Sequence, residues 1–171
     1  MKSLQTLSVT VVGLALLVAC GSSPAPSAAS TPSPAATGTT IAVANDAKLG
    51  SILVDGKGMT VYLFVADTGT ASTCYTSCAN IWPPVLTNGA PQAGTGADKS
   101  MLGTTTRTDG KVEVTYAGHP LYRYAADSKA GQTNGQGVNG FGARWYVVSP
   151  SGKVIKASAA PAPAPPSPYG Y

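Results

Sequence analysis

Apolar and polar positions along this chain change over the short distances that are typical of strands and turns. Runs of β-branched and aromatic residues are broken by Gly, Asp, Asn or Ser, and no stretch carries apolar residues at helical spacing over three turns. We therefore predict a mostly β fold with only short helices. The expected strands form three hairpins, 51–55 with 60–66, 111–116 with 121–125, and 145–148 with 153–157.

The predicted strand 60–66 is apolar on both of its faces. Because side chains alternate along a strand, Tyr62 and Phe64 share one face, while the other face carries only aliphatic residues. A strand of this kind is expected to be central and covered on both sides. In the strand 121–125, Arg123 occupies the face opposite the tyrosines, so this strand is expected to be more exposed.

A pattern of ten residues occurs twice, 60 positions apart: residues 58–67 read GMTVYLFVAD, and residues 118–127 read GHPLYRYAAD. Such self-similarity indicates an internal duplication. The roughly 110 residues between the apolar N-terminus and the Pro-rich C-terminus suffice for one domain with a core but not for two. We therefore expect two tandem β-rich repeats, 46–105 and 106–158, that share one core.

The duplicated residues form a Tyr-x-aromatic-x-x-Asp motif, which consists of Tyr62, Phe64 and Asp67 in the first copy and of Tyr122, Tyr124 and Asp127 in the second. This motif resembles that of a family of predicted bacterial lipoproteins known as the secreted repeat of unknown function. Residues 73–84 and 133–148 are also similar to the family, and the resemblance covers about residues 49–150. It implies the family's fold unit and an extracytoplasmic setting, with no established activity.

The N-terminal segment has the features of a lipoprotein signal. An early Lys2 is followed by an apolar run over residues 7–18, which is shorter than a membrane span of about 20 residues, and then by the sequence LVAC ending at Cys20. This ending looks like a lipobox. We expect residues 1–19 to be removed and Cys20 to carry the lipid that anchors the protein to a bacterial membrane, outside the cytoplasm. The alternative is an ordinary cleaved signal that happens to contain a Cys.

Two further segments are rich in Pro, Ala and Ser. Residues 20–45 contain almost no aromatic or charged side chains, and residues 159–171 alternate Ala and Pro before two tyrosines. Such compositions bury too little apolar surface to offset the entropy of ordering. We expect a disordered tether after Cys20 and a disordered Pro-rich tail.

Cys74 and Cys78 are separated by three residues. Within one helical turn, Cα atoms at this spacing lie at a distance that a disulfide can bridge, and such a bond persists outside the cytoplasm. A structural disulfide in a short helix or loop is the favoured interpretation. A labile redox pair and a metal site are alternatives, although the chain's single His, His119, lies far along the sequence.

The repeated side chains each allow a structural and a functional interpretation. Asp67 and Asp127 precede small-residue turns, and capping of those turns is favoured over a catalytic carboxylate pair. The aromatic residues either form a shared core, which a small domain needs, or present a platform for a sugar, a quinone or a peptide. Core is favoured for these six residues: Tyr62, Phe64, Trp82, Tyr122, Tyr124 and Trp145.

Met59 and His119 occupy equivalent positions in the two copies. If an approximate two-fold axis passes near them, their thioether and imidazole could approach each other and suit copper. A role for His119 in a turn is favoured instead, and neither a metal nor another cofactor is expected. The chain has 11 Lys and Arg against 7 Asp and Glu. These charges are scattered singly, with no basic cluster beyond Lys153 and Lys156, which argues against nucleic acid as a partner.

The sequence points to a module without catalytic activity. With one His and with Glu113 as the only Glu, no set of side chains typical of a hydrolase is evident. We expect a lipid-anchored binding or structural module of the cell envelope, with a cell-wall or envelope-protein partner. The alternative is a redox or copper-handling protein that uses Cys74, Cys78, His119 and Met59.

Overall fold

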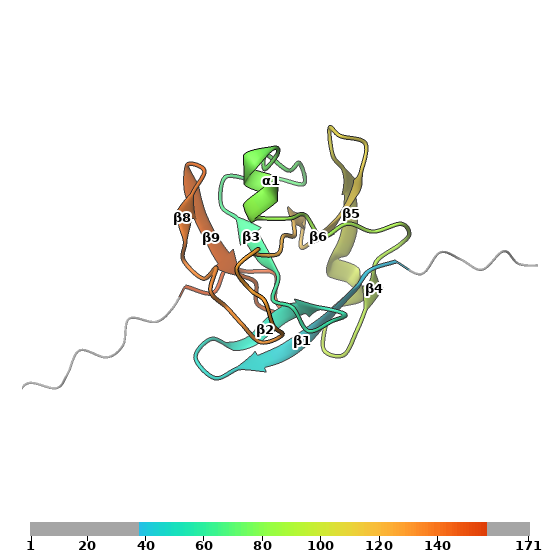
Figure 1. Cartoon of the computed structure of the whole chain (residues 1–171). Helices are drawn as coiled ribbons and strands as arrows, with labels where there is room; N and C mark the ends of the chain where they lie inside the picture. The colour runs from blue at the N-terminus through green and yellow to red at the C-terminus, as the bar shows by residue number, and fades with distance from the viewer. Residues whose placement is uncertain (1–37, 157–171) are drawn as a thin grey trace, which may run out of the picture. The chain divides into compact units, whose positions relative to one another are not determined.

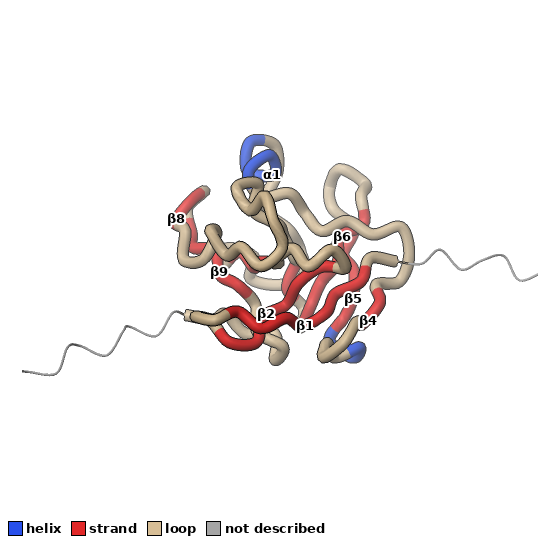
Figure 2. Tube along the Cα trace, turned by 60° about the horizontal axis from the view of Figure 1, so that its bottom comes forward, coloured by secondary structure: helices blue, strands red, loops and turns tan. Residues whose placement is uncertain are grey.

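The computed structural model describes residues 38–156 and shows a mostly β fold, as predicted (Figures 1 and 2). Loops and turns, tan in Figure 2, connect short strands, and the helices are only one turn long. In chain order the elements are β1 (Thr40–Asp46), β2 (Gly50–Asp55), β3 (Tyr62–Phe64), α1 (Ser77–Ile81), β4 (Gln92–Ala93), the 3₁₀ helix η1 (Lys99–Met101), β5 (Leu102–Thr106), β6 (Val112–Tyr116), β7 (His119–Pro120), β8 (Asn139–Gly140) and β9 (Ala143–Val147).

The strands form three small sheets, with the orders β2-β1-β4, β3-β9-β8 and β5-β6-β7. β1 pairs antiparallel with β2, and β5 pairs antiparallel with β6, so each repeat contains a hairpin ahead of its motif. β3 stands at the end of its three-stranded sheet, where it pairs with β9, and on its other side a bridge joins Tyr62 to Tyr122 of the second motif. The strand that carries the first motif therefore has neighbours on both sides, as a central strand does.

The two repeats exchange strand partners. β3, which carries the motif of the first repeat, pairs antiparallel with β9 at the end of the second repeat. In return, the second motif pairs with the end of the first repeat, where the Arg123 N–H donates to the Pro83 carbonyl at 2.8 Å and the Ala125 N–H donates to the Ile81 carbonyl at 2.9 Å. Each motif segment is thus completed by the other repeat.

Buried side chains form two clusters, and both clusters draw on both repeats. Successive residues of β2 and β3 enter opposite clusters, because side chains alternate along a strand. The first cluster contains Ile52, Val54, Tyr62, Phe64, Cys74, Cys78, Trp82, Tyr122, Trp145 and Val147. The second contains Ile41, Leu53, Val61, Leu63, Val85, Val114, Tyr116, Leu121 and Val148. Since neither cluster belongs to one repeat, the predicted shared core is confirmed, and β3 is covered on both faces.

One prediction about the first repeat is wrong, and another holds only in part. The folded region begins at Thr40, so the end of the segment 20–45 forms β1 instead of a disordered tether. β2 takes β1 as its main partner. The predicted hairpin with residues 60–66 is present only next to its turn, where a bridge joins Val54 and Thr60 and the Val61 N–H donates to the Leu53 carbonyl at 3.2 Å. The physical reason is that β3 is drawn away to β9, which leaves β2 to be completed by the residues before it.

The predicted hairpin at the end of the second repeat is present only in part. β9 covers most of 145–148, but residues 153–156 form no named strand and contact it through a bridge between Val148 and Val154. Cys20, the predicted signal and the tail 159–171 lie outside the described residues. Within residues 38–156, no helix has the length and apolar character that crossing a membrane requires.

Candidate functional site

The two copies of the motif meet at Tyr62 and Tyr122. The Tyr62 N–H donates to the Tyr122 carbonyl at 2.8 Å, and the Tyr122 N–H donates to the Tyr62 carbonyl at 3.0 Å. Such a reciprocal pair is the unit of an antiparallel ladder. The two equivalent residues are therefore related by an approximate two-fold axis that passes between them.

The side chains of the motif are exchanged in the same way. The Tyr62 hydroxyl donates to Oδ2 of Asp127, and the Tyr122 hydroxyl donates to Oδ2 of Asp67, both at 2.5 Å. All four side chains are buried. Burial, together with the neighbouring carboxylates, raises the pKa of both tyrosines above its ordinary range, so both hydroxyls remain protonated donors. The motif therefore joins each repeat to the other.

The second oxygen of each motif carboxylate holds a local loop. Oδ1 of Asp67 accepts from the Thr73 N–H at 2.8 Å and from the Thr73 hydroxyl at 2.6 Å. Oδ1 of Asp127 accepts from the Asn134 N–H at 3.0 Å. The predicted capping of the following loop thus accounts for the hydrogen bonds that Oδ1 of each Asp accepts. Sequence reasoning missed the other oxygen, because nothing in a single repeat shows that its Asp bonds a Tyr of its duplicate.

Four aromatic rings stack through the first cluster in the order Phe64, Trp145, Trp82 and Tyr124. Neighbouring ring centroids lie 4.1, 4.0 and 4.3 Å apart. The outer rings occupy equivalent motif positions, and each inner ring comes from the end of a repeat. Since Phe64 and both tryptophans are at most 2% exposed, these three rings form core, whereas Tyr124 at the end of the stack is half-buried.

Gly135 lies directly against these rings. A Cβ atom at this position would lie 2.8 Å from ring carbons of both Trp82 and Tyr62. The Gly135 N–H also donates to the Tyr62 hydroxyl at 3.3 Å. The close approach of backbone to ring requires a residue without a side chain here.

A buried polar chain runs from Tyr122 to Arg107, whose side chain is 1% exposed. Nη1 of Arg107 donates to Oγ of Ser72 and to Oε2 of Glu113, both at 2.7 Å. The hydroxyls of Ser72 and Tyr122 lie 2.7 Å apart. Because Tyr122 gives its one proton to Asp67, the Ser72 hydroxyl supplies the proton for this bond. These hydrogen bonds thus link the ion pair of Arg107 and Glu113 in the second repeat to both motifs.

Glu113 is the most deeply buried acid of this chain of contacts, with 0% exposure. Burial raises the pKa of Glu113 to about 7, and the bond from Arg107 opposes this shift. No hydrogen-bond partner for its Oε1 occurs in the described part of the protein. Sequence reasoning missed the Arg107–Glu113 pair. The available signal was a lone Glu between Val112 and Val114 on a strand, six positions after an Arg.

Cys74 and Cys78 form a disulfide, with their Cα atoms 5.2 Å apart, and Cys78 lies in α1 as predicted. The two residues are 0% and 6% exposed. Nη2 of Arg107 donates to the Cys74 carbonyl at 2.7 Å, and its guanidinium lies 4.4 Å from the centre of the Tyr75 ring. The disulfide therefore fixes the loop before α1 against the core, where it is shielded from solvent.

Met59 and His119 are not brought together. The motif strands run antiparallel from the contact between Tyr62 and Tyr122, and each of these two residues precedes its own Tyr by three positions. They therefore lie on opposite sides of that contact, about 20 Å apart along the strands at roughly 3.3 Å per residue. No group of three His, Cys, Asp or Glu side chains converges anywhere in residues 38–156 as a metal site requires.

His119 instead lines a groove beside β9 and the residues that follow β3. The groove holds about 940 Å³ and is lined by residues of the segments 63–67, 142–146 and 152–156, together with Asn139. Three of the lining residues, Arg144, Lys153 and Lys156, are exposed cations. No carboxylate of the described residues lies within 4.0 Å of their charged nitrogens. We refer to this groove as the cationic groove.

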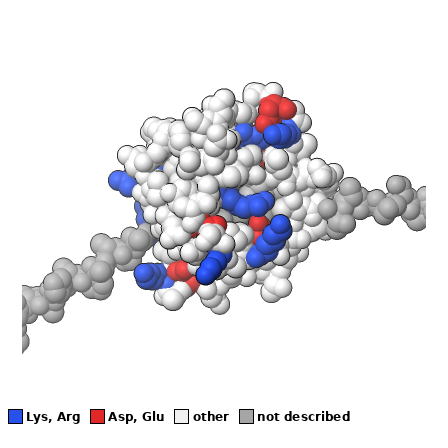
Figure 3. All heavy atoms as spheres, in the orientation of Figure 1, with Lys and Arg blue, Asp and Glu red and all other residues white. Residues whose placement is uncertain are grey.

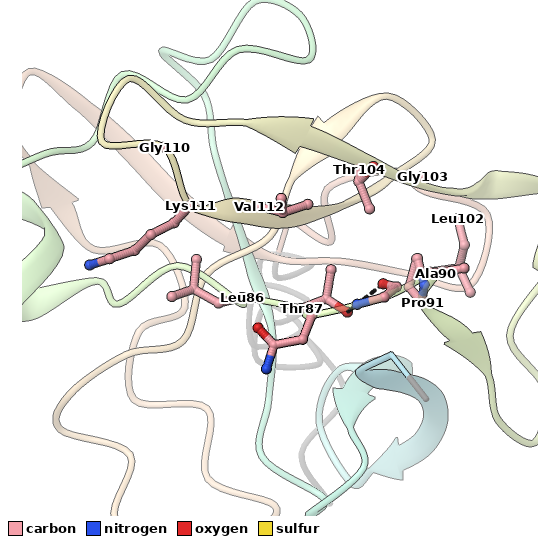
Figure 4. Close-up of a pocket in the computed structure, with 12 residues that line it drawn as sticks. Leu86, Thr87, Ala90, Pro91, Leu102, Gly103, Thr104, Gly110, Lys111 and Val112 are labelled. Carbon is pink, nitrogen blue, oxygen red and sulfur yellow. Dashed lines mark hydrogen bonds between the residues drawn. The ribbon is translucent and has the colours of Figure 1, made fainter. Parts of the chain in front are cut away.

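A second groove, of about 670 Å³, lies between the segment 86–91 and the hairpin of β5 and β6 (Figure 4). Leu86 and Thr87 belong to one wall, and Thr104 and Val112 belong to the other. Its one charged residue is Lys111, whose amine lies 3.7 Å from a carboxylate oxygen of Asp109. This neutral groove therefore offers no free charge with which to select a ligand.

Charges of both signs are mixed elsewhere on the surface. On the face drawn in Figure 3, Lys and Arg atoms lie beside Asp and Glu atoms in several places. Arg123, for example, lies 3.3 Å from a carboxylate oxygen of Asp55. Other exposed lysines, such as Lys48 and Lys129, also have no carboxylate within 4.0 Å, but the cationic groove is lined by three such cations together.

A family model described as a secreted repeat of unknown function matches the chain twice, over residues 43–86 and 103–149. Together the two matches cover more than half of the chain, and they correspond to the two repeats that exchange strands. No curated protein and no solved structure matches the chain.

Proposed function

Because the chain belongs to the family of the secreted repeat of unknown function, we propose that it is a non-enzymatic module that acts in the bacterial cell envelope and binds its ligand on its surface. The description of the family as secreted supports a location outside the cytoplasm. The observation that carries the proposal is that the side chains of the motif are used to join the two repeats.

The motif keeps no free group for chemistry. Asp67 and Asp127 are 2% and 6% exposed, and each carboxylate accepts hydrogen bonds on both of its oxygens. A catalytic acid or base must come within hydrogen-bond distance of its substrate. These carboxylates are enclosed by other residues of the same protein, which supports a role in building the fold. Ligand binding would then take place in the surface grooves.

The same reasoning supports a structural role for the disulfide over a redox role. Reactive cysteines are partly exposed and lie in electropositive surroundings that stabilise a thiolate. Arg107 is close, but its guanidinium is directed to the Cys74 carbonyl, and both cysteines are buried. Reduction would require the loop before α1 to open first.

We further propose that a lipid on Cys20 anchors the protein to the membrane. The proposal rests on the sequence LVAC at residues 17–20 and on the apolar run before it. In cells supplied with a labelled fatty acid, the wild-type protein should carry the label and sediment with membranes. Cys20→Ser should lose both properties, whereas the neighbouring control Ser23→Ala should keep them. A wild-type protein that is released with an unmodified Cys20 would contradict the anchor.

The binding role can be tested without the lipid. Residues 21–171 should sediment with isolated cell envelopes at a temperature well below unfolding. Tyr62→Phe should sediment equally well, because this substitution weakens the contact between the repeats and leaves the surface unchanged. If folded Tyr62→Phe protein lost envelope binding, the motif would have a functional role that the proposal denies.

A further inference from the structure

We propose that the cationic groove binds a phosphate-bearing polymer of the cell envelope, in which phosphodiester groups link polyol or sugar units. This inference rests on the proposed envelope function and names a ligand class for it. Three properties of the groove support it: unpartnered cations, exposed apolar surface beside them, and a strained aromatic residue at the groove's edge.

The cations are arranged to meet more than one anionic group. Lys153 and Lys156 both line the groove and lie on either side of Val154, which forms a bridge with Val148. Arg144 lies on the neighbouring strand β9, where its Nη1 donates to the Gly137 carbonyl at 3.0 Å. This bond fixes the guanidinium and leaves other N–H groups free for phosphate oxygens. Asp67, the acidic residue among those that line the groove, already bonds Tyr122 and Thr73.

Apolar surface lies between these cations. Val65 is 48% exposed, and Tyr146 and Val154 are half-buried. Small-ligand sites combine a largely apolar lining with a few well-placed polar groups. A polymer of phosphates and polyols fits this combination, because its phosphates meet the cations while its C–H faces pack on the side chains between them.

Phe141 stands at the tip of the hairpin of β8 and β9, next to the lining residue Gly142. Its φ is 57°, and it is 49% exposed. A two-residue turn with positive φ at both positions favours Asn or Gly, and a bulky residue in this conformation is strained. The chain thus keeps a large ring in solvent at a position that disfavours it. Packing of a sugar or polyol unit against this ring would explain both features.

The shape of the groove favours a chain-like ligand over a membrane surface. A flat bilayer cannot enter a concave groove of about 940 Å³, and the three cations that line it carry more positive charge than one phosphate ion neutralises. A polymer with several phosphate groups can bring an anion to each cation. A bilayer is therefore the competing partner that the experiment must exclude.

The test measures binding of residues 21–171 to soluble poly(glycerol phosphate) by calorimetry at about 0.15 M salt. The groove variant replaces three cations, as Arg144→Gln, Lys153→Gln and Lys156→Gln. The control variant makes the same change in net charge at exposed lysines elsewhere, as Lys48→Gln, Lys99→Gln and Lys129→Gln. We expect the groove variant to lose at least about tenfold in affinity, because each cation near an anionic surface contributes separately. The control should stay within about twofold.

A second variant tests the aromatic contribution. Phe141→Asn places at the turn a residue that tolerates positive φ, so the fold is retained while the ring is removed. We expect a several-fold loss of affinity for poly(glycerol phosphate) and little change for inorganic polyphosphate, which has no polyol units. Equal losses for both polymers would show that the ring does not recognise the polyol.

Three outcomes would overturn the proposal. Equal losses in the groove and control variants would show that binding depends on net charge alone. Binding to phosphatidylglycerol vesicles without binding to the polymer would make the membrane the partner. Absence of binding to the polymer would exclude this ligand class. None of these results would change the lipidation or envelope sedimentation of the wild-type protein, so failure of this inference is distinguishable from failure of the proposed function.

Discussion

The bond between Tyr62 and Asp127 offers the most direct test of how the repeats are joined. Tyr62→Phe removes one buried hydroxyl and leaves both Oδ2 of Asp127 and the N–H of Gly135 without that partner. A hydrogen bond to a charged acceptor contributes about 1.5–3 kcal/mol, and the orphaned groups add to the loss. We expect Tyr62→Phe to lower the free energy of unfolding by about 2–3 kcal/mol. Most single domains of this size retain their fold after such a loss.

A double-mutant cycle separates the contact between repeats from other effects. Tyr62→Phe, Asp127→Asn and the double variant should show a coupling energy of about 1 kcal/mol or more, because each single change removes the same bond. The control cycle combines Tyr62→Phe with Asp67→Asn. These two residues belong to the same copy of the motif and do not bond each other, so their coupling should stay below about 0.5 kcal/mol.

The assay is urea unfolding at pH 7, followed by the fluorescence of the stacked tryptophans and extrapolated linearly to water. Unchanged slopes with denaturant would show that the variants alter stability and not the denatured state. If the control cycle gave the larger coupling, each Tyr would depend on the Asp of its own repeat. That result would refute the exchange of side chains between repeats.

Three further predictions test the loops and the buried charge. Gly135→Ala should cost about 1–3 kcal/mol, because its Cβ would overlap two rings, whereas Gly69→Ala, with no heavy atom within 4 Å, should be nearly neutral. Folded protein of residues 21–171, which lacks Cys20, should show no free thiol in mild reductant, and Cys74→Ser with Cys78→Ser should cost about 2 kcal/mol; ready reduction of the folded protein would contradict a structural disulfide. Burial raises the pKa of Glu113 from 4.5 to about 7, so its stabilising contribution is complete below pH 4.5 and is lost as the pH rises through 7. Up to about 3 kcal/mol should change over this range, and Glu113→Gln should flatten the profile; a parallel profile would assign the pH dependence to another group.

The sequence was sufficient for features that depend on local pattern or on composition. Apolar character on both faces of residues 60–66 predicted that β3 is covered on both sides, and the structure confirms this. The spacing of Cys74 and Cys78 predicted a disulfide in a short helix or loop. Duplication in too short a chain predicted that the repeats share their core. Side-chain alternation and cysteine spacing act on neighbouring residues, and the requirement for a large enough core acts on the whole chain, so each can be evaluated without knowing which distant segments pair.

Features that depend on pairing between distant segments could not be predicted in this way. The alternation of side chains and the β-branched and aromatic composition favoured a hairpin of 51–55 with 60–66. Strand propensity does not specify which strand is the partner, and β3 pairs with β9 instead. β1 was missed because residues 40–46 follow a segment of tether-like composition. The cationic groove was missed because Arg144 is distant in sequence from Lys153 and Lys156, and the three cations gather only when the chain folds.

The exchanged contacts also explain why the chain contains two repeats. One copy alone would leave its motif Tyr and Asp without partners and its motif strand without a neighbour, and a chain of that length buries too little surface for a stable core. Two copies supply each other with these partners, a neighbouring strand and enough buried surface, provided that each fixes the loop after its Asp. In the first repeat this loop is fixed by the Cys74–Cys78 disulfide and by Arg107 of the second repeat, whereas in the second repeat Gly135 packs against the rings. The repeats have thus diverged in how they hold their loops and have kept the Tyr and Asp through which they hold each other.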